Sequence, residues 1–386
     1  MQVGSHEKVL IVMNDTEQKI KEMIIELHRI PGIGWHNIDR AVNAAMWTRE
    51  SWDAGQLQEI GFRKERAQKA AALLAGKRQS PALASSGPIE QSGTAIITCY
   101  DKNYPSILKE IAQPPWVLYA KGRLELLERP AVALVGTRVP TAYGRHTAAL
   151  MARELAQDGF AVVSGLAKGV DAIAHLAALE EKGGTIAVLP TPIDTCYPSE
   201  NMSLFRKIAQ NGLLLSETPL GTVLHRGQFH QRNRIIAGLS RATIVVEGAS
   251  QSGSLITAKF AFQMDRELFA VPGPISSPKS EGPNALIRDG MAKLISSSRQ
   301  VASELEWLGD TVSKQPAARS DGPLSASSGE SEEELKLIAL LQDQQLTIDE
   351  LHEISGIPFG HLNALLLNLC IKRKIGLQAG SIYCVL

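Results

Sequence analysis

Hydrophobic residues gather in six short runs through the middle of the chain, and most of these runs are followed by a turn and a stretch of helical length. Continuous apolar runs of this length are typical of strands that are buried on both faces of a parallel sheet. Their alternation with helices predicts an α/β fold with a mostly parallel sheet between two layers of helices. The predicted strands span residues 131–135, 161–164, 185–189, 213–216, 242–246 and 267–271.

Two patterned segments flank this middle part. Residues 1–80 are predicted to form an N-terminal helical domain, in which Pro31-Gly32-Ile33-Gly34 interrupts the helical pattern. Residues 81–305 form the predicted sheet domain, whose first residues are rich in Ser, Pro and Gly. Small and polar residues predict a flexible linker over 306–330. Residues 331–386 are patterned again and predict a separate C-terminal domain of helices and a short hairpin.

Both flanking segments resemble known modules. The PGIG turn between two helical stretches resembles the hairpin of helix-hairpin-helix and SAM-like domains, whose backbone amides contact DNA phosphates. The C-terminal segment resembles a winged helix, with Lys372-Arg373-Lys374 next to the wing. Its candidate groove face, formed by His361, Asn363 and Asn368, carries little charge. A DNA contact and a protein contact therefore both stay open for this domain.

Composition narrows the class of protein. With 386 residues the chain predicts two or three domains, and its 40 basic residues balance 40 acidic ones. Zero net charge excludes a uniformly basic DNA-coating protein but leaves room for a local basic cleft. Because no apolar run approaches the ~20 residues of a membrane span, we expect no such span and no secretory signal. Four cysteines without a CxxC pair argue against a disulfide framework and fit a reducing cytoplasm.

Glycines, small hydroxyl residues and cations follow three of the predicted strands. The segments are Gly136–Arg138, Ser164–Asp171 and Glu247–Ser254. The carboxyl ends of parallel strands meet at one edge of a sheet, where ligands bind. Glycine lets the backbone approach an anion, and the amides of a helix N-terminus attract phosphate. With Arg138 and Lys168 beside those amides, the convergence predicts a phosphate site; tight turns alone are the alternative.

A fourth candidate is the run from Arg226 to Ile236, which we interpret as a loop. Three arginines surround the single aromatic residue Phe229, and this is the composition of a groove for single-stranded nucleic acid, where cations contact phosphates and a ring stacks on a base. Two alternatives stay open. Arg234 would pack against its own helix in one, and Phe229 would cap the sheet edge in the other.

The usual catalytic motifs are absent from the sequence. It contains no GxxxxGK[ST], GxSxG or HExxH motif, and no GxGxxG follows the first predicted strand. His175 lies four residues after Asp171 and so shares a helix face with it. We interpret this pair as part of a hydrogen-bond network at a helix start rather than as a catalytic base. We expect no metal site.

Seven motifs in order resemble the DprA/Smf family of DNA-processing proteins over about half of the chain, from about Asp101 to about Gly290. The motifs are GTRVPTAYG, SGLAKGVDAIAH, YPSEN, SET, RNRII, SGSLITA and VPGP. The resemblance implies an extended Rossmann-like domain that binds single-stranded DNA and hands it to the recombinase RecA during natural transformation, the competence-linked uptake of DNA. It also implies a homodimer, no cofactor and no enzymatic activity.

The resemblance also implies roles for particular residues. Phe229 would stack on a base. Lys168 stands where the family more often has arginine, and because lysine lacks the bidentate fork its contact should be softer. Pro190–Asp194 replaces a glycine-containing turn, and proline has no N–H to offer phosphate. The implied phosphate-binding residues are Gly136, Thr137, Arg138, Ser164, Gly165, Lys168, Gly169, Arg226, Arg232, Asn233, Arg234, Ser252, Gly253 and Ser254.

Two functions from other classes compete with DNA binding. Phosphoribohydrolases, which cleave nucleotide N-glycosidic bonds, use a similar phosphate pocket, and Glu247 before Gly248 would be the acid of such an enzyme. A nucleotide-sensing regulatory domain with a winged-helix output is the other. The arginines of the RNR motif suit DNA and have no evident role in a hydrolase of small nucleotides.

Overall fold

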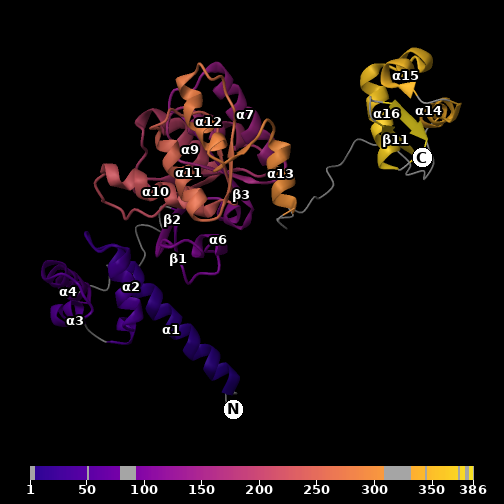
Figure 1. The fold of residues 1–386 in the computed structure, drawn as a ribbon. Coiled ribbons are helices and arrows are strands. Elements are labelled where there is room, and N and C mark those ends of the chain that lie inside the picture. Colours follow the sequence, from indigo (N-terminus) through magenta and orange to yellow (C-terminus); the bar gives the residue numbers. More distant parts are fainter. Residues whose placement is uncertain are drawn as a thin grey trace. The chain divides into compact units, whose positions relative to one another are not determined.

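The structure is a computed structural model that describes residues 5–49, 52–78, 93–307, 332–343, 346–372, 374–378 and 382–385. By its internal contacts the chain divides into two compact units, Met1–Lys314 and Gln315–Leu386, and each unit is described by itself (Figure 1). The predicted boundary at residues 80 and 81, and nearly all of the predicted linker over 306–330, lie outside the described residues.

The first unit begins with a group of helices. The apolar stripe of the first helix includes Ile24 and Leu27, both fully buried, and the chain leaves that helix through Gly32, whose φ of 89° few other residues adopt. Asp53 caps a later helix by accepting a hydrogen bond from the amide of Gln56 at 2.8 Å. The elements are α1 (Ser5–His28), α2 (Trp35–Asn43), η1 (Met46–Thr48), α3 (Ala54–Glu59) and α4 (Lys64–Arg78).

These helices pack onto one end of a large sheet. Trp35 Nε1 donates to the carbonyl oxygen of Pro114 at 2.7 Å, Trp116 Nε1 donates to that of Trp35 at 3.2 Å, and Lys21 pairs with Asp101 at 2.8 Å. Met23, Ile24 and Leu27 of α1 share one buried cluster with residues of the sheet. The N-terminal helices therefore share a core with the sheet.

The sheet has nine strands among the described residues, in the order β1-β2-β6-β5-β4-β3-β7-β8-β9. From β6 to β9 neighbouring strands run parallel, whereas β1 and β2 are antiparallel additions at one edge. The prediction of a mostly parallel sheet is confirmed. The strands are β1 (Thr94–Thr98), β2 (Val117–Gly122), β3 (Ala131–Val135), β4 (Ala161–Ser164), β5 (Thr185–Leu189), β6 (Leu213–Ser216), β7 (Ala242–Val245), β8 (Glu267–Ala270) and β9 (Lys293–Leu294).

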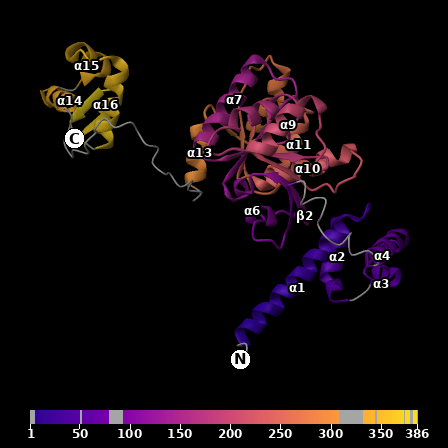
Figure 2. The same ribbon diagram turned by 180° about the vertical axis from the view of Figure 1, so that it is seen from behind.

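Helices cover both faces of the sheet, as the two ribbon views show (Figures 1 and 2). Alternate side chains of β3 point to opposite faces, so Val132 and Leu134 join one buried cluster whereas Ala133 and Val135 join another. The helices are α6 (Ser106–Lys109), η3 (Leu124–Glu128), α7 (Ala142–Gln157), α8 (Val170–Ala178), η4 (Ser199–Asn201), α9 (Met202–Asn211), α10 (Arg226–Leu239), α11 (Gly253–Gln263), η5 (Pro278–Ser280), α12 (Glu281–Arg288) and α13 (Ser298–Trp307).

The strand order decides where a ligand would bind. After β3 the chain adds strands outward on one side through β4, β5 and β6, and it then returns to place β7 on the other side of β3. The loops that follow β3, β4 and β7 therefore diverge from one point at the carboxyl edge, which is the usual ligand site of such sheets.

In its described residues, the second unit combines three helices with a small antiparallel sheet of order β10-β12-β11. Thr347 and Glu350 form a capping box at the start of α15, and Gly356 ends that helix with a φ of 70°. These elements suit a winged helix, and that assignment stays a prediction. They are α14 (Glu332–Asp343), β10 (Leu346–Thr347), α15 (Ile348–Ser355), α16 (Phe359–Ile371), β11 (Ile375–Gln378) and β12 (Ile382–Val385).

Two side chains of the predicted groove face pair with acids inside this unit. His361 Nε2 lies 2.8 Å from Glu333, and the Asn368 side-chain amide donates to Glu334 at 2.6 Å. Lys372 also pairs with Glu334, at 2.8 Å. These acids place negative charge beside the face.

Candidate functional site

A cavity of about 340 Å³ lies at the carboxyl edge of the sheet, beside the ends of β3, β4 and β5. One side of it is formed by α10 and another by the segment before η4. Its position is the one expected from the strand order. The lining residues are Arg138, Gly165, Ala167, Lys168, Pro190, Cys196, Tyr197, Pro198, Ser199, Glu200, Phe229 and Arg232.

Two cations reach this cavity from different loops. Arg138, in the loop after β3, is exposed and has no ion pair within the described part of the chain. Lys168, in the loop after β4, pairs with Glu200 at 2.5 Å, and both side chains are more than half exposed. Such an exposed pair contributes little to stability, so Lys168 can exchange Glu200 for a phosphate at small cost. The structure brings Arg138 and Lys168 together at one cavity, as the sequence predicts.

Gly169 makes this convergence sterically possible. Its φ is +77°, and a Cβ atom there would lie 2.4 Å from the carbonyl oxygen of Thr137 and 2.6 Å from that of Arg138. The amide of Val170 donates to the Thr137 carbonyl at 3.2 Å, and the amide of Thr137 donates to the carbonyl of Glu247 at 2.7 Å. Backbone contacts thus connect the loops after β3, β4 and β7.

Backbone amides of the loop after β4 donate hydrogen bonds to side chains of the protein itself. Asp171 Oδ2 accepts from the amides of Gly165 and Ala167 at 3.2 and 3.3 Å. Ser164 is fully buried, and its hydroxyl donates to the Leu134 carbonyl at 2.7 Å. The prediction that Ser164 and the Gly165 amide face a phosphate is therefore wrong, because both stabilise the loop instead; Gly165 still lines the cavity.

His175 completes this internal network, as predicted. Its Nε2 accepts from the Leu166 amide at 3.2 Å, and its Nδ1 lies 2.7 Å from the hydroxyl of Thr185. Since that hydroxyl donates to the Val162 carbonyl, Nδ1 of His175 carries the proton and the imidazole is neutral. Burial lowers the pKa of His175 to about 3, so it stays neutral and is no catalytic base at neutral pH.

Arg232 lines the cavity and is buried. Only 7% of it is exposed, and its guanidinium donates to the carbonyls of Gly165 and Val188 at 2.5 Å. Burial lowers the pKa of Arg232 to about 10, against the opposing charge of Asp171, so the group stays protonated at neutral pH. The sequence predicts a loop at this residue, but Arg232 lies on α10 and its guanidinium is buried.

Phe229 also lies on α10, and it lines the cavity. Half-buried, it contacts the ring of Tyr197 edge-to-face, with ring centroids 5.2 Å apart. The predicted loop over 226–236 is wrong: a helix begins at Arg226, and the amide of His225 donates to Gln228 Oε1 at 2.6 Å in its capping box. Tyr197 was missed as a site residue, although it stands in the YPSEN motif.

Other predicted residues lie outside the cavity. Arg226 is exposed at the first position of α10, and Asn233 donates to the Gly253 carbonyl at a long 3.4 Å. Arg234 binds both carboxylate oxygens of Glu217, at 2.5 and 2.6 Å, so its role is structural, although its partner lies after β6 and not on its own helix as the alternative stated. Those that do not line the cavity are Gly136, Thr137, Ser164, Gly169, Arg226, Asn233, Arg234, Ser252, Gly253 and Ser254.

Glu247, the candidate acid of a hydrolase, is also directed away from the cavity. It is 3% exposed, and its carboxylate accepts from the amide and the hydroxyl of Thr141 at 2.9 and 2.5 Å. A Cβ atom on Gly144 would lie 2.2 Å from it. The carboxylate therefore stabilises the N-terminus of α7 and does not line the cavity.

A mostly parallel sheet with a cationic, aromatic-lined cavity at its switch point defines a Rossmann-like α/β protein with a candidate ligand site at the carboxyl edge of the sheet. A family described as DNA recombination-mediator protein A matches residues 95–306. The protein Smf of Synechocystis is 36% identical over 321 residues, which are 76% of this chain and 81% of that protein. The chain belongs to this family, and the resemblance drawn from the seven motifs is confirmed.

Solved structures agree. The X-ray structure of DNA processing protein A from Streptococcus pneumoniae is 34% identical, with a TM-score of 0.64 over 74% of this chain and 97% of that one. The structure of DNA processing protein A from Helicobacter pylori, which concerns its single-stranded DNA binding mode, is 35% identical, with a TM-score of 0.51 over 55% of this chain and 96% of that one. Among the helices described, none has the length and hydropathy of a membrane span.

Proposed function

We propose that this protein binds single-stranded DNA in the cavity at the carboxyl edge of its sheet and loads RecA onto that strand during natural transformation. In this proposal it acts in the cytoplasm as a homodimer, and it catalyses no reaction. The family's description as a DNA recombination mediator supports a role beside a recombinase, whereas RecA itself and the dimer rest on the resemblance of the seven motifs. The observation that carries DNA binding is the meeting of Arg138, Lys168 and Phe229 in one cavity.

The chemistry of the cavity suits a single strand. Arg138 and Lys168 would contact phosphates, and the Phe229–Tyr197 pair offers ring surface for a base. Stacking needs an unpaired base, which a duplex does not present. Neither stacking nor a phosphate contact reads base edges, so little sequence preference is expected. Arg226, exposed at the start of α10, would contact a phosphate just outside the cavity.

We expect the full chain to bind single-stranded oligonucleotides more tightly than duplex of the same sequence, and to lose affinity as salt rises. Each phosphate contact on a single strand lowers log K by ~0.7 per unit of log salt concentration. Arg138→Ala should therefore reduce that slope by about one contact. Fluorescence anisotropy over a salt series measures both quantities. Equal affinity for duplex and single strand would contradict the proposal.

Phe229→Ala tests base stacking. Loss of a stacked ring is expected to weaken single-strand binding by ~1–3 kcal/mol and to leave the salt slope nearly unchanged, because no phosphate contact is lost. Phe262→Ala is the matched control, since Phe262 is a half-exposed ring on α11 that does not line the cavity. The melting temperature is measured for both variants. Lost stability with intact affinity would make Phe229 a packing residue only.

A further inference from the structure

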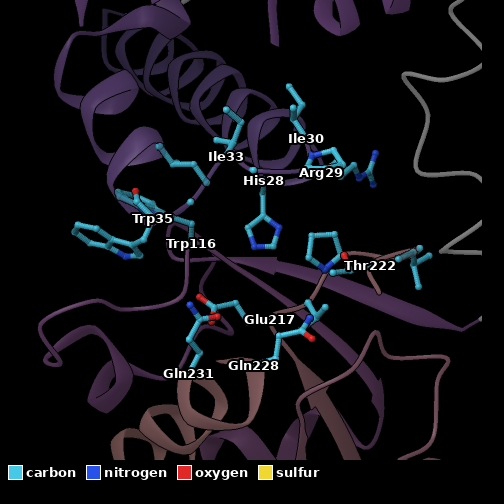
Figure 3. A pocket seen from close by; sticks show the side chains of 18 of the residues that line it. His28, Arg29, Ile30, Ile33, Trp35, Trp116, Glu217, Thr222, Gln228 and Gln231 are labelled. Atoms are coloured by element: carbon cyan, nitrogen blue, oxygen red, sulfur yellow. The ribbon is translucent and has the colours of Figure 1, made fainter. Parts of the chain in front are cut away.

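A second cavity, of about 570 Å³, also has residues of α10 in its lining and shares none of them with the proposed DNA site. Its walls come from the end of α1, the hairpin before α2, the segment before β2 and the segment between β6 and α10. Figure 3 shows the ring of His28 pointing into it from α1, towards Glu217, Gln228 and Gln231. Its volume is that of an ordinary small-molecule site.

Helix α10 contributes to both cavities, and they have no lining residue in common. Phe229 and Arg232 line the proposed DNA site, whereas Gln228 and Gln231 line the second cavity. Gln228 and Arg232 are four residues apart and so neighbour each other on the helix, yet each lines a different cavity. Because no residue lines both cavities, a substitution in one removes no lining residue of the other.

Two indole rings, those of Trp35 and Trp116, line one part of the second cavity. Trp35 and Trp116 are half-buried, with ring centroids 5.6 Å apart and planes tilted by 33°. Both indole N–H groups already donate to backbone carbonyls, of Pro114 and of Trp35. The rings are therefore held in place, and what they offer a ligand is an apolar face for stacking.

Polar groups without partners stand opposite these rings. Nδ1 of His28 is buried with no hydrogen-bond partner within the described residues, so a ligand would meet this ring at Nε2, which is not one of those buried atoms. Burial, together with the nearby charge of Arg29, lowers the pKa of His28 to about 4, so its imidazole is neutral at neutral pH. The Gln231 side chain is exposed, and the charge of Arg234 is balanced by Glu217. These groups suit a ligand that both donates and accepts hydrogen bonds.

We propose that the second cavity binds a nucleobase, which stacks on the Trp35–Trp116 pair and presents its polar edge to His28 and Gln231. Aromatic rings and side-chain amides are the groups that proteins use for base faces and base edges. The base could come from a free nucleoside or from a strand that passes over the exposed start of α10. The second source rests on the proposed function; the first does not.

Titration of the full chain with adenosine tests the proposal, with ribose 5-phosphate as the matched probe that lacks a base. Calorimetry measures affinity, and quenching of tryptophan emission reports binding beside the indoles. Saturable adenosine binding is expected, with none for ribose 5-phosphate. Gln231→Leu removes an exposed amide and should weaken adenosine binding about threefold to tenfold, the range of one net hydrogen bond. Phe229→Ala, in the proposed DNA site, should leave it unchanged.

His28→Phe separates binding from packing. It keeps a ring of similar shape and removes an unpaired buried nitrogen, so the melting temperature should stay the same or rise while adenosine affinity falls. A purely structural His28 would show no such loss of affinity. The proposal is overturned if adenosine does not bind saturably, if ribose 5-phosphate binds as well, or if neither Gln231→Leu nor His28→Phe changes the affinity.

A competition experiment identifies the source of the base. If a bound strand supplies it, saturating single-stranded oligonucleotide displaces adenosine, and Gln231→Leu weakens oligonucleotide binding too. If a free nucleoside is the ligand, adenosine binds equally well in the presence of the oligonucleotide. Adenosine binding by a chain that binds no single-stranded DNA would refute the proposed function and leave the nucleobase site standing.

Discussion

Arg232→Ala is expected to destabilise the protein by ~3–5 kcal/mol, because it removes one charge from a buried network and leaves the other charge uncompensated. Arg232 is 7% exposed and donates to the carbonyls of Gly165 and Val188, and its charge lies near the buried carboxyl of Asp171. Burial raises the pKa of Asp171, and the charge of Arg232 opposes that rise. Chemical unfolding measures the free energy.

Arg138→Ala is the matched control for this variant. Arg138 lines the same cavity, but it is exposed and has no ion pair in the described structure, so its loss should change the free energy of unfolding by less than ~0.5 kcal/mol. Single-strand affinity should nevertheless fall, by ~1.5–3 kcal/mol for one charge-assisted contact. If Arg232→Ala unfolds with the same free energy as Arg138→Ala, the structural role of Arg232 is refuted.

Gly169→Ala is expected to destabilise the protein by about 2–5 kcal/mol, since it combines an unfavourable backbone conformation with overpacking. The φ of Gly169 is +77°, and an added Cβ atom would lie 2.4 Å from the Thr137 carbonyl oxygen and 2.6 Å from that of Arg138. Backbone atoms cannot rotate away as a side chain does, so the loop after β3 would move. Single-strand affinity should fall at least about tenfold, the value of one hydrogen bond to a charged group.

Gly253→Ala provides the comparison. Gly253 is the first residue of α11, and a Cβ atom there would meet no atom within 4 Å. Alanine is also the better helix former, so this variant should be as stable as the parent or slightly more stable. Thermal unfolding and oligonucleotide binding are measured on both variants. A Gly169→Ala protein that matches Gly253→Ala in both measurements would show that the two loops do not depend on the glycine.

Much of the sheet could be predicted from the sequence, because buried parallel strands are continuous apolar runs. The six predicted runs became β3 to β8. The edge strands were not predicted. β9 has only two residues, and both are exposed. β1 and β2 are antiparallel additions, and they lack the alternation of apolar run and helical stretch that marks the parallel strands in the sequence. An edge strand carries a weak signal, since its identity depends on the neighbour to which it hydrogen-bonds.

The candidate site was predictable in place and only partly in detail. Loops that follow parallel strands meet at one edge of the sheet, so glycines and cations in those loops indicate the same edge before any side-chain contact is known. Arg138 and Lys168 could be predicted in this way. The interpretation of residues 226–236 as a loop failed, because most of that run is polar and the helix buries Gln228 and Arg232 on faces that hydrophobic periodicity does not reveal.

By itself the sequence determined the α/β class, the carboxyl edge as the place of function and, through seven ordered motifs, the family. The tertiary structure alone decided which basic residues are free. Arg138, Arg232 and Arg234 are chemically identical, yet Arg232 contacts core carbonyls, Arg234 pairs with Glu217, and Arg138 is exposed. The physical reason is that an arginine's role is set by the acceptors around it, and those acceptors come from strands and loops distant in the sequence.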